Sequence, residues 1–292
     1  MAIEKVLVVG MGLMGRGIAQ VCAQAGLDTY VYDISKEAAQ KSVKAIETGL
    51  DRRVEKGKIS VADKEAVMGC ITVVDSLAEA KDVDIVEEAV FEDLEVKKKV
   101  FAELGKVMSS KTIIGSNTSA LAATPLATAT GRPEKFMIIH FHQPPTVMRL
   151  VEIVRALQTS DETAKVVHDF CQQLGKTAVE VKKDCPGFLT NRTMVPLLNE
   201  VYYCLYEGIC TKEDIDTAFK AGFNWPMGPV ELSDFIGLDT MLHICEYLHK
   251  ECGGNKYLPC PLLKNMVAAG YLGVKSGKGF YEYREGRKVE GS

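Results

Sequence analysis

The chain has 292 residues, 47% of them hydrophobic and 25% charged, with a formal net charge of −4 at pH 7. This composition is ordinary for a globular protein, and the length is sufficient for two domains. The acidic balance argues against a nucleic-acid-binding protein, because such proteins carry a basic surface. No apolar stretch reaches the roughly 18 residues that a membrane span needs, so we expect no membrane partner.

Nine cysteines are scattered along the chain without a paired CxxC spacing. An odd, unpatterned set in a chain of this length indicates reduced thiols in a reducing compartment. The N-terminus shows no secretory leader, and we therefore expect a cytoplasmic protein. His249, Cys252 and Cys260 lie near one another in the sequence, but their spacing is not that of a zinc site, so we expect no metal.

Residues 1–184 alternate between strand-like and helix-like segments. The early strand candidates are continuous apolar runs, as expected for parallel strands that are covered on both faces. The alternation predicts an α/β domain built on a Rossmann-type doubly wound sheet. Strands are expected at 5–9, 28–33, 71–74, 84–90, 112–116, 136–141, 150–154 and 177–182, and helices include 15–25, 36–56 and 93–108.

Residues 185–292 are expected to form a second, all-α domain. The segment "KKDCPGF" at 182–188 marks the boundary, because its proline and glycine interrupt the pattern. Pro196 lies inside the first expected helix and should kink or restart it, whereas the prolines of "YLPCPLL" stand at a helix start, where proline is tolerated. The expected helices are 190–208, 212–222, 229–250 and 259–270, and no strand is indicated.

A glycine cluster follows the first apolar run, in "VLVVGMGLMGRGIAQ" at residues 6–20. Gly10, Gly12 and Gly15 have the GxGxxG spacing, with a strand before them and an amphipathic segment after them. In such a turn the first glycine permits the sharp bend, the second lets the backbone approach a pyrophosphate, and the third allows close helix–strand packing. We therefore predict a dinucleotide-binding turn; a turn that binds nothing is the alternative.

The residues around this turn indicate which dinucleotide binds. The helix start at Leu13 and Met14 would present unpaired N–H groups to the phosphates. Asp33, at the end of the next expected strand, should accept hydrogen bonds from the ribose hydroxyls and would repel a 2′-phosphate. These features favour NAD over NADP. FAD is a second alternative, because the same turn serves it, although no other FAD signature is present.

A second group of candidate residues lies between 88 and 152. The lysines at 97–99 are typical of a solvated helix face, and "SNTSAL" at 116–121 follows a strand end, where ligands bind in open α/β sheets. His140 ends another strand. Glu152 stands in the apolar strand "LVEIV", where a carboxylate is unusual unless it is paired.

The turn-like "QPPT" between His140 and Glu152 would let their strands lie side by side. We therefore predict a His–carboxylate pair suited to general acid–base catalysis, in which the carboxylate stabilises the imidazolium. A core histidine together with a surface glutamate is the alternative.

These motifs, together with "DCPGFLTNR", "NWPMGPVELSDFIGLDT" and "YLGVKSGKGFYEY", resemble the L-3-hydroxyacyl-CoA dehydrogenase family over nearly the whole chain. The resemblance implies an N-terminal NAD-binding domain and a C-terminal helical domain through which the protein forms a homodimer. It also implies NAD-dependent oxidation of an L-3-hydroxyacyl-CoA to the 3-ketoacyl-CoA, or the reverse, with a short or variant acyl group.

The resemblance assigns roles to individual residues. It makes His140 the catalytic base, Glu152 its partner, and Ser119 and Asn191 contacts of the substrate. The nicotinamide half of the cofactor site would be formed by Glu92, Lys97, Ser116 and Asn117. A basic stretch resembles the region that meets the CoA phosphates and comprises Arg52, Arg53, Lys56 and Lys58.

One motif departs from the family pattern. The family usually has "HFFNP" where this chain has "HFHQP". Gln143 replaces an asparagine near the catalytic histidine and is one methylene longer, which is enough to alter a substrate pocket. His142 replaces an aromatic residue and places a titratable ring near the site. The simpler interpretation is that His142 faces the other side of the strand.

Two other functions fit the same scaffold. One is a dehydrogenase of a non-CoA hydroxy acid or sugar acid, which would keep the His–Glu pair. The other is a non-catalytic, crystallin-like protein, which has no need for Ser119, His140, Glu152 and Asn191 together. The Tyr-xxx-Lys pattern of short-chain dehydrogenases occurs twice. Tyr32 stands at the end of the expected ribose-binding strand, and Tyr271 stands in a glycine-flanked loop. We therefore interpret both matches as accidental.

Overall fold

The computed structural model describes residues 2–291. The chain divides into two compact units, Met1–Phe188 and Leu189–Ser292, whereas the sequence analysis placed the division after residue 184. The first unit has two hydrophobic cores, and the second has one of its own. Within the described residues, no helix combines the length and the apolar character that crossing a membrane requires.

The first unit is built on one eight-stranded sheet with the order β3-β2-β1-β4-β5-β6-β7-β8. All neighbouring strands are parallel except β6 and β7, which are antiparallel. This confirms the doubly wound α/β prediction. The strands are β1 (Lys5–Val9), β2 (Asp28–Tyr32), β3 (Ile71–Val73), β4 (Ile85–Glu88), β5 (Ile113–Ser116), β6 (Phe136–Phe141), β7 (Leu150–Arg155) and β8 (Thr177–Val181).

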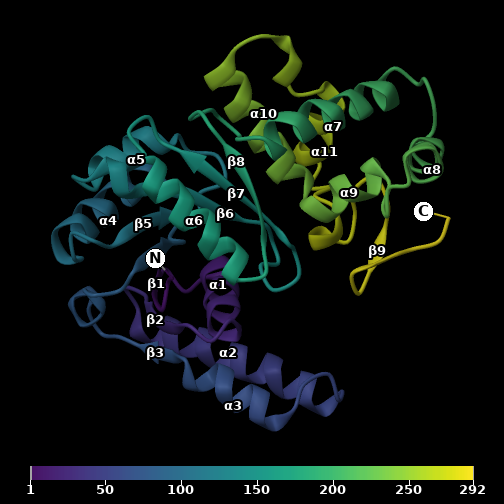
Figure 1. Cartoon of the computed structure of the whole chain (residues 1–292). Helices are drawn as coiled ribbons and strands as arrows, with labels where there is room; N and C mark the ends of the chain where they lie inside the picture. Colours follow the sequence, from purple (N-terminus) through teal and green to yellow (C-terminus); the bar gives the residue numbers. More distant parts are fainter. Residues whose placement is uncertain (1, 292) are drawn as a thin grey trace. The chain divides into compact units, whose positions relative to one another are not determined.

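Helices cover both faces of this sheet (Figure 1). Helices α1, α2 and α6 pack on one face and share a core with alternate strand residues, while α4 and α5 pack on the other. Strand residues such as Val6 and Leu7 therefore enter different cores, which explains the continuous apolar runs. The helices are α1 (Leu13–Gln24), α2 (Lys36–Glu55), α3 (Val61–Gly69), α4 (Leu94–Val107), α5 (Ala123–Ala129) and α6 (Asp161–Gln173).

Most longer helices of this unit begin at a side chain that accepts backbone N–H groups. Ser35 caps α2, Asp93 caps α4 and Ser160 caps α6. Helix α1 differs, because it begins after Gly12 with no side-chain cap and no acidic residue in its first turn. The backbone N–H groups of its first turn therefore have no side-chain acceptor at the N-cap and need a different hydrogen-bond partner.

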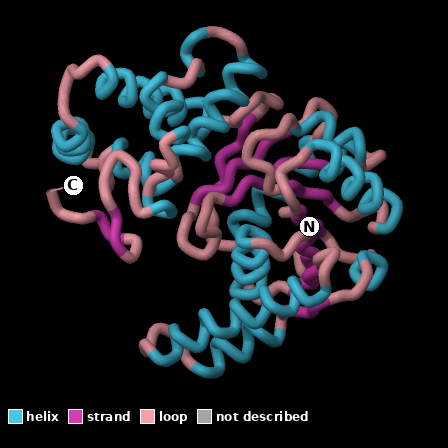
Figure 2. The backbone as a smooth tube through the Cα atoms, turned by 180° about the vertical axis from the view of Figure 1, so that it is seen from behind, coloured by secondary structure: helices cyan, strands magenta, loops and turns pink. Residues whose placement is uncertain are grey.

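The second unit is mainly helical, and a two-stranded hairpin that the sequence did not indicate lies near its end (Figure 2). The expected helix at 229–250 is two helices, because Gly237 between them has φ +102°, outside the right-handed helical region. Of the two effects expected at Pro196, a kink or a restart, the restart is wrong, since one helix continues through it. The elements are α7 (Thr190–Tyr206), α8 (Lys212–Phe223), α9 (Pro229–Ile236), α10 (Leu238–Cys252), α11 (Pro261–Ala268), β9 (Tyr283–Arg284) and β10 (Arg287–Lys288).

Two buried aspartates organise this unit. Asp216 accepts the backbone N–H of Val230, at the start of α9, and the hydroxyl of Tyr281. Asp234 accepts the backbone N–H groups of Phe280 and Tyr281. These bonds tie the segment after α11 to α8 and α9, so both carboxylates have structural roles.

Candidate functional site

A cleft of about 690 Å³ lies at the carboxyl ends of β1, β2 and β4. Ligands of open α/β sheets bind at this edge. Six residues that the sequence analysis selected contribute to its lining, namely Gly10, Gly12, Leu13, Met14, Asp33 and Gln143. The structure thus places Gln143, which was expected at the substrate, on the cleft that the glycine turn forms.

The three glycines of the turn differ in what surrounds them. Gly10 has φ +92°, and a Cβ on it would lie 2.8 Å from the backbone of Ala89. A Cβ on Gly15 would lie 1.8 Å from the carbonyl oxygen of Gly10. A Cβ on Gly12 would meet no atom within 4 Å. Gly10 and Gly15 are therefore required by the fold, whereas Gly12 keeps open the space in front of α1.

The groups around this space suit a dinucleotide. The uncapped start of α1 offers N–H groups to an anion. Asp33 is held beside it, because its Oδ2 accepts the Met11 N–H at 2.8 Å and its Oδ1 accepts the Ser35 N–H at 3.0 Å. A phosphate-binding helix start next to a fixed carboxylate is the arrangement that NAD requires.

The cleft also has an apolar rim that the sequence analysis missed. Ile34 is 96% exposed and Phe91 is 79% exposed, and both line the cleft. Large apolar side chains in such open positions are suited to contact with a flat base. Ile34 could have been selected from the sequence as a residue of the cleft, because it directly follows Asp33.

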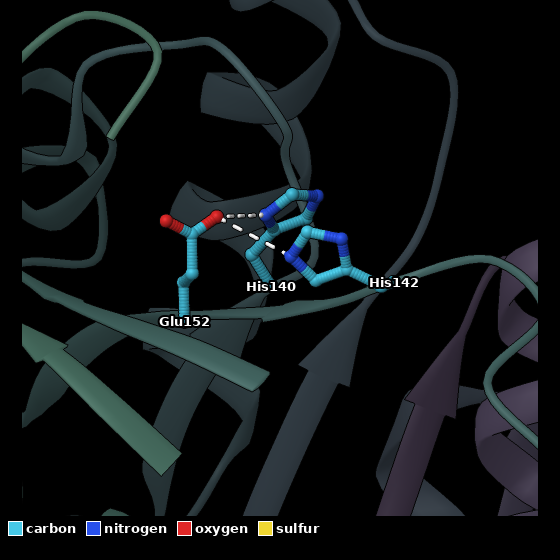
Figure 3. A group of neighbouring side chains, drawn as sticks. All are labelled: His140, His142 and Glu152. Carbon is cyan, nitrogen blue, oxygen red and sulfur yellow. Dashed lines mark hydrogen bonds and ion pairs between the residues drawn. The ribbon is translucent and has the colours of Figure 1, made fainter. Parts of the chain in front are cut away.

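His140 and Glu152 are in contact. They lie directly opposite each other on the antiparallel strands β6 and β7, with His140 Nδ1 3.0 Å from Glu152 Oε2 (Figure 3). Glu152 is fully buried and His140 nearly so. The alternative of a surface glutamate is therefore wrong. The ring of Phe188 packs edge-on against His140, with 5.7 Å between ring centroids.

His142 joins this pair. Its Nε2 lies 3.4 Å from Glu152 Oε2, and its ring centroid is 4.7 Å from that of His140 (Figure 3). The expectation that His142 faces the other side of the strand is wrong, because side chains two positions apart in an extended segment share a face. His142 Nε2 is buried and has no hydrogen-bond partner among the described residues.

Lys97 is not part of a solvated helix face. It is 1% exposed, and its Nζ lies 2.6 Å from Glu88 Oε1 and 3.3 Å from Glu92 Oε2. Ser116 donates to the other oxygen of Glu88 at 2.7 Å. Burial raises the pKa of Glu88, and the Lys97 ammonium opposes that shift. Glu88, which the sequence analysis missed, thus links two residues expected near the nicotinamide, Lys97 and Ser116.

Asn117 and Ser119 lie just beyond β5. Asn117 Oδ1 accepts the backbone N–H of Phe141 at 2.8 Å, which holds the end of β6 beside β5. The backbone N–H of Ser119 donates to Glu92 Oε1 at 3.0 Å. The backbone N–H of Asn117 also donates to the carbonyl oxygen of Glu88, so both residues connect to the ion pairs of Lys97 with Glu88 and Glu92.

A second acidic side chain of β4 has no such partners. Glu87 is fully buried, and neither of its carboxylate oxygens has a hydrogen-bond partner among the described residues. Burial raises its pKa well above the ordinary value, and the neighbouring charge of Glu88 adds to the shift. Glu87 points to the opposite face of the sheet from Glu88, since adjacent strand residues alternate.

Three predicted site residues lie elsewhere. Arg53 is in the last turn of α2 and Lys56 is its C-cap, outside the lining of the cleft described above. Asn191 is in the first turn of α7, in the second unit. The roles of these three residues remain predictions.

Comparison with known families identifies both parts of the chain. Residues 5–185 match the model described as 3-hydroxyacyl-CoA dehydrogenase, NAD binding domain. Residues 187–283 match the model of the 3-hydroxyacyl-CoA dehydrogenase C-terminal domain. The NAD cofactor inferred from the glycine turn and Asp33 is thereby confirmed.

Similar proteins cover almost the whole chain. The probable 3-hydroxybutyryl-CoA dehydrogenase of Bacillus subtilis is 47% identical over 285 residues, which are 98% of this chain and 99% of that protein. The 3-hydroxybutyryl-CoA dehydrogenase of Bradyrhizobium diazoefficiens is 44% identical over 98% of both chains. The crystal structure of (S)-3-hydroxybutyryl-CoA dehydrogenase from Ralstonia eutropha superposes with a TM-score of 0.93 at 44% identity, covering 97% of this chain and all of that one.

Proposed function

Because this chain belongs to the 3-hydroxyacyl-CoA dehydrogenase family, we propose that it oxidises an L-3-hydroxyacyl-CoA to the 3-ketoacyl-CoA with NAD, or catalyses the reverse. The observation that carries the proposal is the buried His140–Glu152 pair, at the same sheet edge as the dinucleotide cleft. Several relatives are named 3-hydroxybutyryl-CoA dehydrogenases, which supports a short acyl group.

His140 acts as the base in this mechanism. With its ring proton on Nδ1, it donates to Glu152 Oε2, and Nε2 remains free to accept the proton of the C3 hydroxyl. The buried Glu152 carboxylate stabilises the imidazolium that results. Bound NAD supplies the acceptor for the hydrogen that leaves C3 with its electron pair. In the reverse direction the imidazolium returns its proton to the ketone oxygen.

The other site residues bind and orient. The start of α1 and Asp33 hold the pyrophosphate and the adenosine ribose, and the network of Glu92, Lys97, Ser116 and Asn117 shapes the nicotinamide end. Ser119 and Asn191 hydrogen-bond the substrate. We place the CoA phosphates near Arg53 and Lys56 at the end of α2, where the two cationic side chains would bind an anion.

A substrate panel tests this function. NADH oxidation is followed at 340 nm with acetoacetyl-CoA, free acetoacetate and a keto sugar acid, using wild type and His140→Gln. We expect turnover only with the thioester and a loss of about 10²-fold or more in the variant. Turnover of the free acids would instead support a non-CoA dehydrogenase. No turnover of any compound, or full activity in His140→Gln, would contradict the proposal.

We also propose that the protein is a homodimer that associates through its C-terminal helical unit. Several large apolar side chains on this unit are more than half exposed, which is costly for a monomer: Tyr206, Ile209, Phe223 and Phe235. Sedimentation equilibrium should give twice the mass of one chain, and Phe223→Glu should lower it. A monomer at micromolar concentration would refute this assembly.

The proposed compartment is the reducing cytoplasm, since all nine cysteines are free thiols in the structure. Alkylation under denaturing conditions during cell lysis, followed by mass spectrometry, should find nine modified cysteines. Disulfide-linked peptides from the same sample would contradict this location.

A further inference from the structure

We propose that His140, His142 and Glu152 form a Zn²⁺ site, and that zinc bound there inhibits the enzyme by occupying its acid–base pair. One ligand atom from each residue lies within 4.8 Å of the others. Two imidazoles and a carboxylate form a common donor set of zinc sites that keep a fourth position for water. The proposal goes beyond the proposed dehydrogenase activity, because the mechanism proposed above includes no metal.

The distances suit zinc. Bonds of about 2.0–2.2 Å in a tetrahedral arrangement place ligand atoms about 3.3–3.6 Å apart. Glu152 Oε2 lies 3.0 Å from His140 Nδ1 and 3.4 Å from His142 Nε2. All three ligand atoms lie within 4.8 Å of one another, so side-chain rotation is the movement that zinc binding would require. Figure 3 shows both imidazole rings on the same side of the carboxylate.

The state of His142 is a second, independent observation. Its Nε2 is buried and lacks a hydrogen-bond partner among the described residues, although it is directed at a carboxylate that His140 already engages. A buried polar atom without a partner is costly, and a bound cation would remove that cost. The side chain of His142 is 24% exposed, which leaves a route for an ion to enter.

Inhibition follows from the atom that zinc would occupy. Neutral His140 carries one ring proton, and in the catalytic form that proton is on Nδ1 and bonded to Glu152. Zinc bound to Nδ1 requires the same proton to move to Nε2. The ring then has no lone pair for the substrate hydroxyl, and the Glu152 charge is engaged by the metal. No net proton is released or consumed by this exchange.

The test compares wild type with His142→Phe, after both are stripped with a chelator. His168→Phe serves as the matched control, because His168 is a partly exposed histidine on α6. Zinc stoichiometry is measured by competition with a chromophoric chelator, and Co²⁺ is used in parallel because its visible spectrum reports tetrahedral coordination. We expect one more bound ion in wild type and His168→Phe than in His142→Phe.

Activity gives a second readout, expressed relative to the zinc-free rate of each protein. The zinc concentration for half-inhibition should be about 10-fold or more higher in His142→Phe than in wild type. Mg²⁺, which prefers oxygen ligands, should not inhibit. Thermal unfolding shows that the variants are folded, and His142→Asn provides a second substitution should the phenylalanine not fit.

Two outcomes would overturn the proposal: the same stoichiometry in wild type and His142→Phe, or the same zinc sensitivity in both. Metal binding is measured without substrate. A protein that binds zinc through His142 but turns over no thioester would therefore refute the proposed function and leave the metal site standing.

Discussion

His140 and Glu152 are opposed residues of two antiparallel strands, and their side chains meet 3.0 Å apart within the sheet. The backbone hydrogen bonds of β6 and β7 thus set the position of both groups, and no loop has to close for the pair to form. Every other pair of neighbouring strands in the eight-stranded sheet is parallel. Among the described residues, the only reversal in the large sheet therefore coincides with the proposed catalytic pair.

Replacing Glu152 by glutamine should lower kcat by about 10²-fold or more while KM changes less, because an amide cannot stabilise the imidazolium. Steady-state kinetics with acetoacetyl-CoA measure the effect. Glu180→Gln is the matched control, since Glu180 lies on the neighbouring strand β8 and pairs with Arg155 near the surface. Equal kcat values in the two variants would contradict a role for the Glu152 charge.

Replacing Gly12 by alanine should leave the fold intact and weaken NADH binding by about 10-fold or more, because the methyl group would enter the space in front of α1. Cofactor titration by fluorescence measures the affinity. Gly49→Ala, on α2, is the control: its Cβ also meets no atom within 4 Å, and alanine in a helix should add up to about 1 kcal/mol of stability. Unchanged NADH affinity in Gly12→Ala would refute the pyrophosphate assignment.

Replacing Asp33 by alanine should raise KM for NAD by about 10-fold and improve the relative use of NADP, because a charged hydrogen-bond acceptor is lost. The values of kcat/KM with both cofactors measure this preference. Asp75→Ala removes a carboxylate that forms an exposed ion pair with Lys36 and should change neither value. An unaltered ratio of NAD to NADP use in Asp33→Ala would exclude the ribose contact.

Glu87 should make the protein less stable as pH rises. Its pKa is raised in the folded state, so the folded protein binds this proton more tightly than the unfolded chain does. Its contribution to stability is complete below the unfolded pKa of about 4.3 and is lost as pH rises toward the folded value, by at most about 1.4 kcal/mol per pH unit.

Denaturation with urea at pH 5 and pH 8 measures this loss. Glu87→Gln cannot titrate, so its free energy of unfolding should fall less between the two values than that of wild type. If the free energy of unfolding fell equally with pH in wild type and in Glu87→Gln, Glu87 would not be a neutral group in the folded protein.

The sequence was most informative where local rules operate. Alternating segments and the glycine spacing predicted the doubly wound sheet and the cofactor turn, since both depend on residues close in the chain. The pairing of His140 with Glu152 was also predictable, because a carboxylate in an apolar strand needs a partner and a short turn brings the strands together.

Other features depended on contacts that no local pattern encodes. Lys97 is typical of a solvated helix face in the sequence, whereas in the structure it is buried against Glu88, which also accepts a hydrogen bond from Ser116. Gly237 breaks a segment whose helical periodicity continues on both sides. The position of His142 follows from a local rule, because side chains two residues apart in an extended segment, here His140 and His142, share a face.

The connection between β6 and β7 covers residues 142–149 and carries both positions at which this chain departs from the "HFFNP" pattern. Lys176 donates to the carbonyl oxygens of Pro145 and Met148 and so anchors this segment to the residue before β8. We expect this segment to influence which acyl group is accepted, because it carries Gln143, while strands β6 and β7 hold His140 and Glu152. Exchanging the segment between homologues as a cassette should then alter acyl-group preference, although its His142 also contacts Glu152.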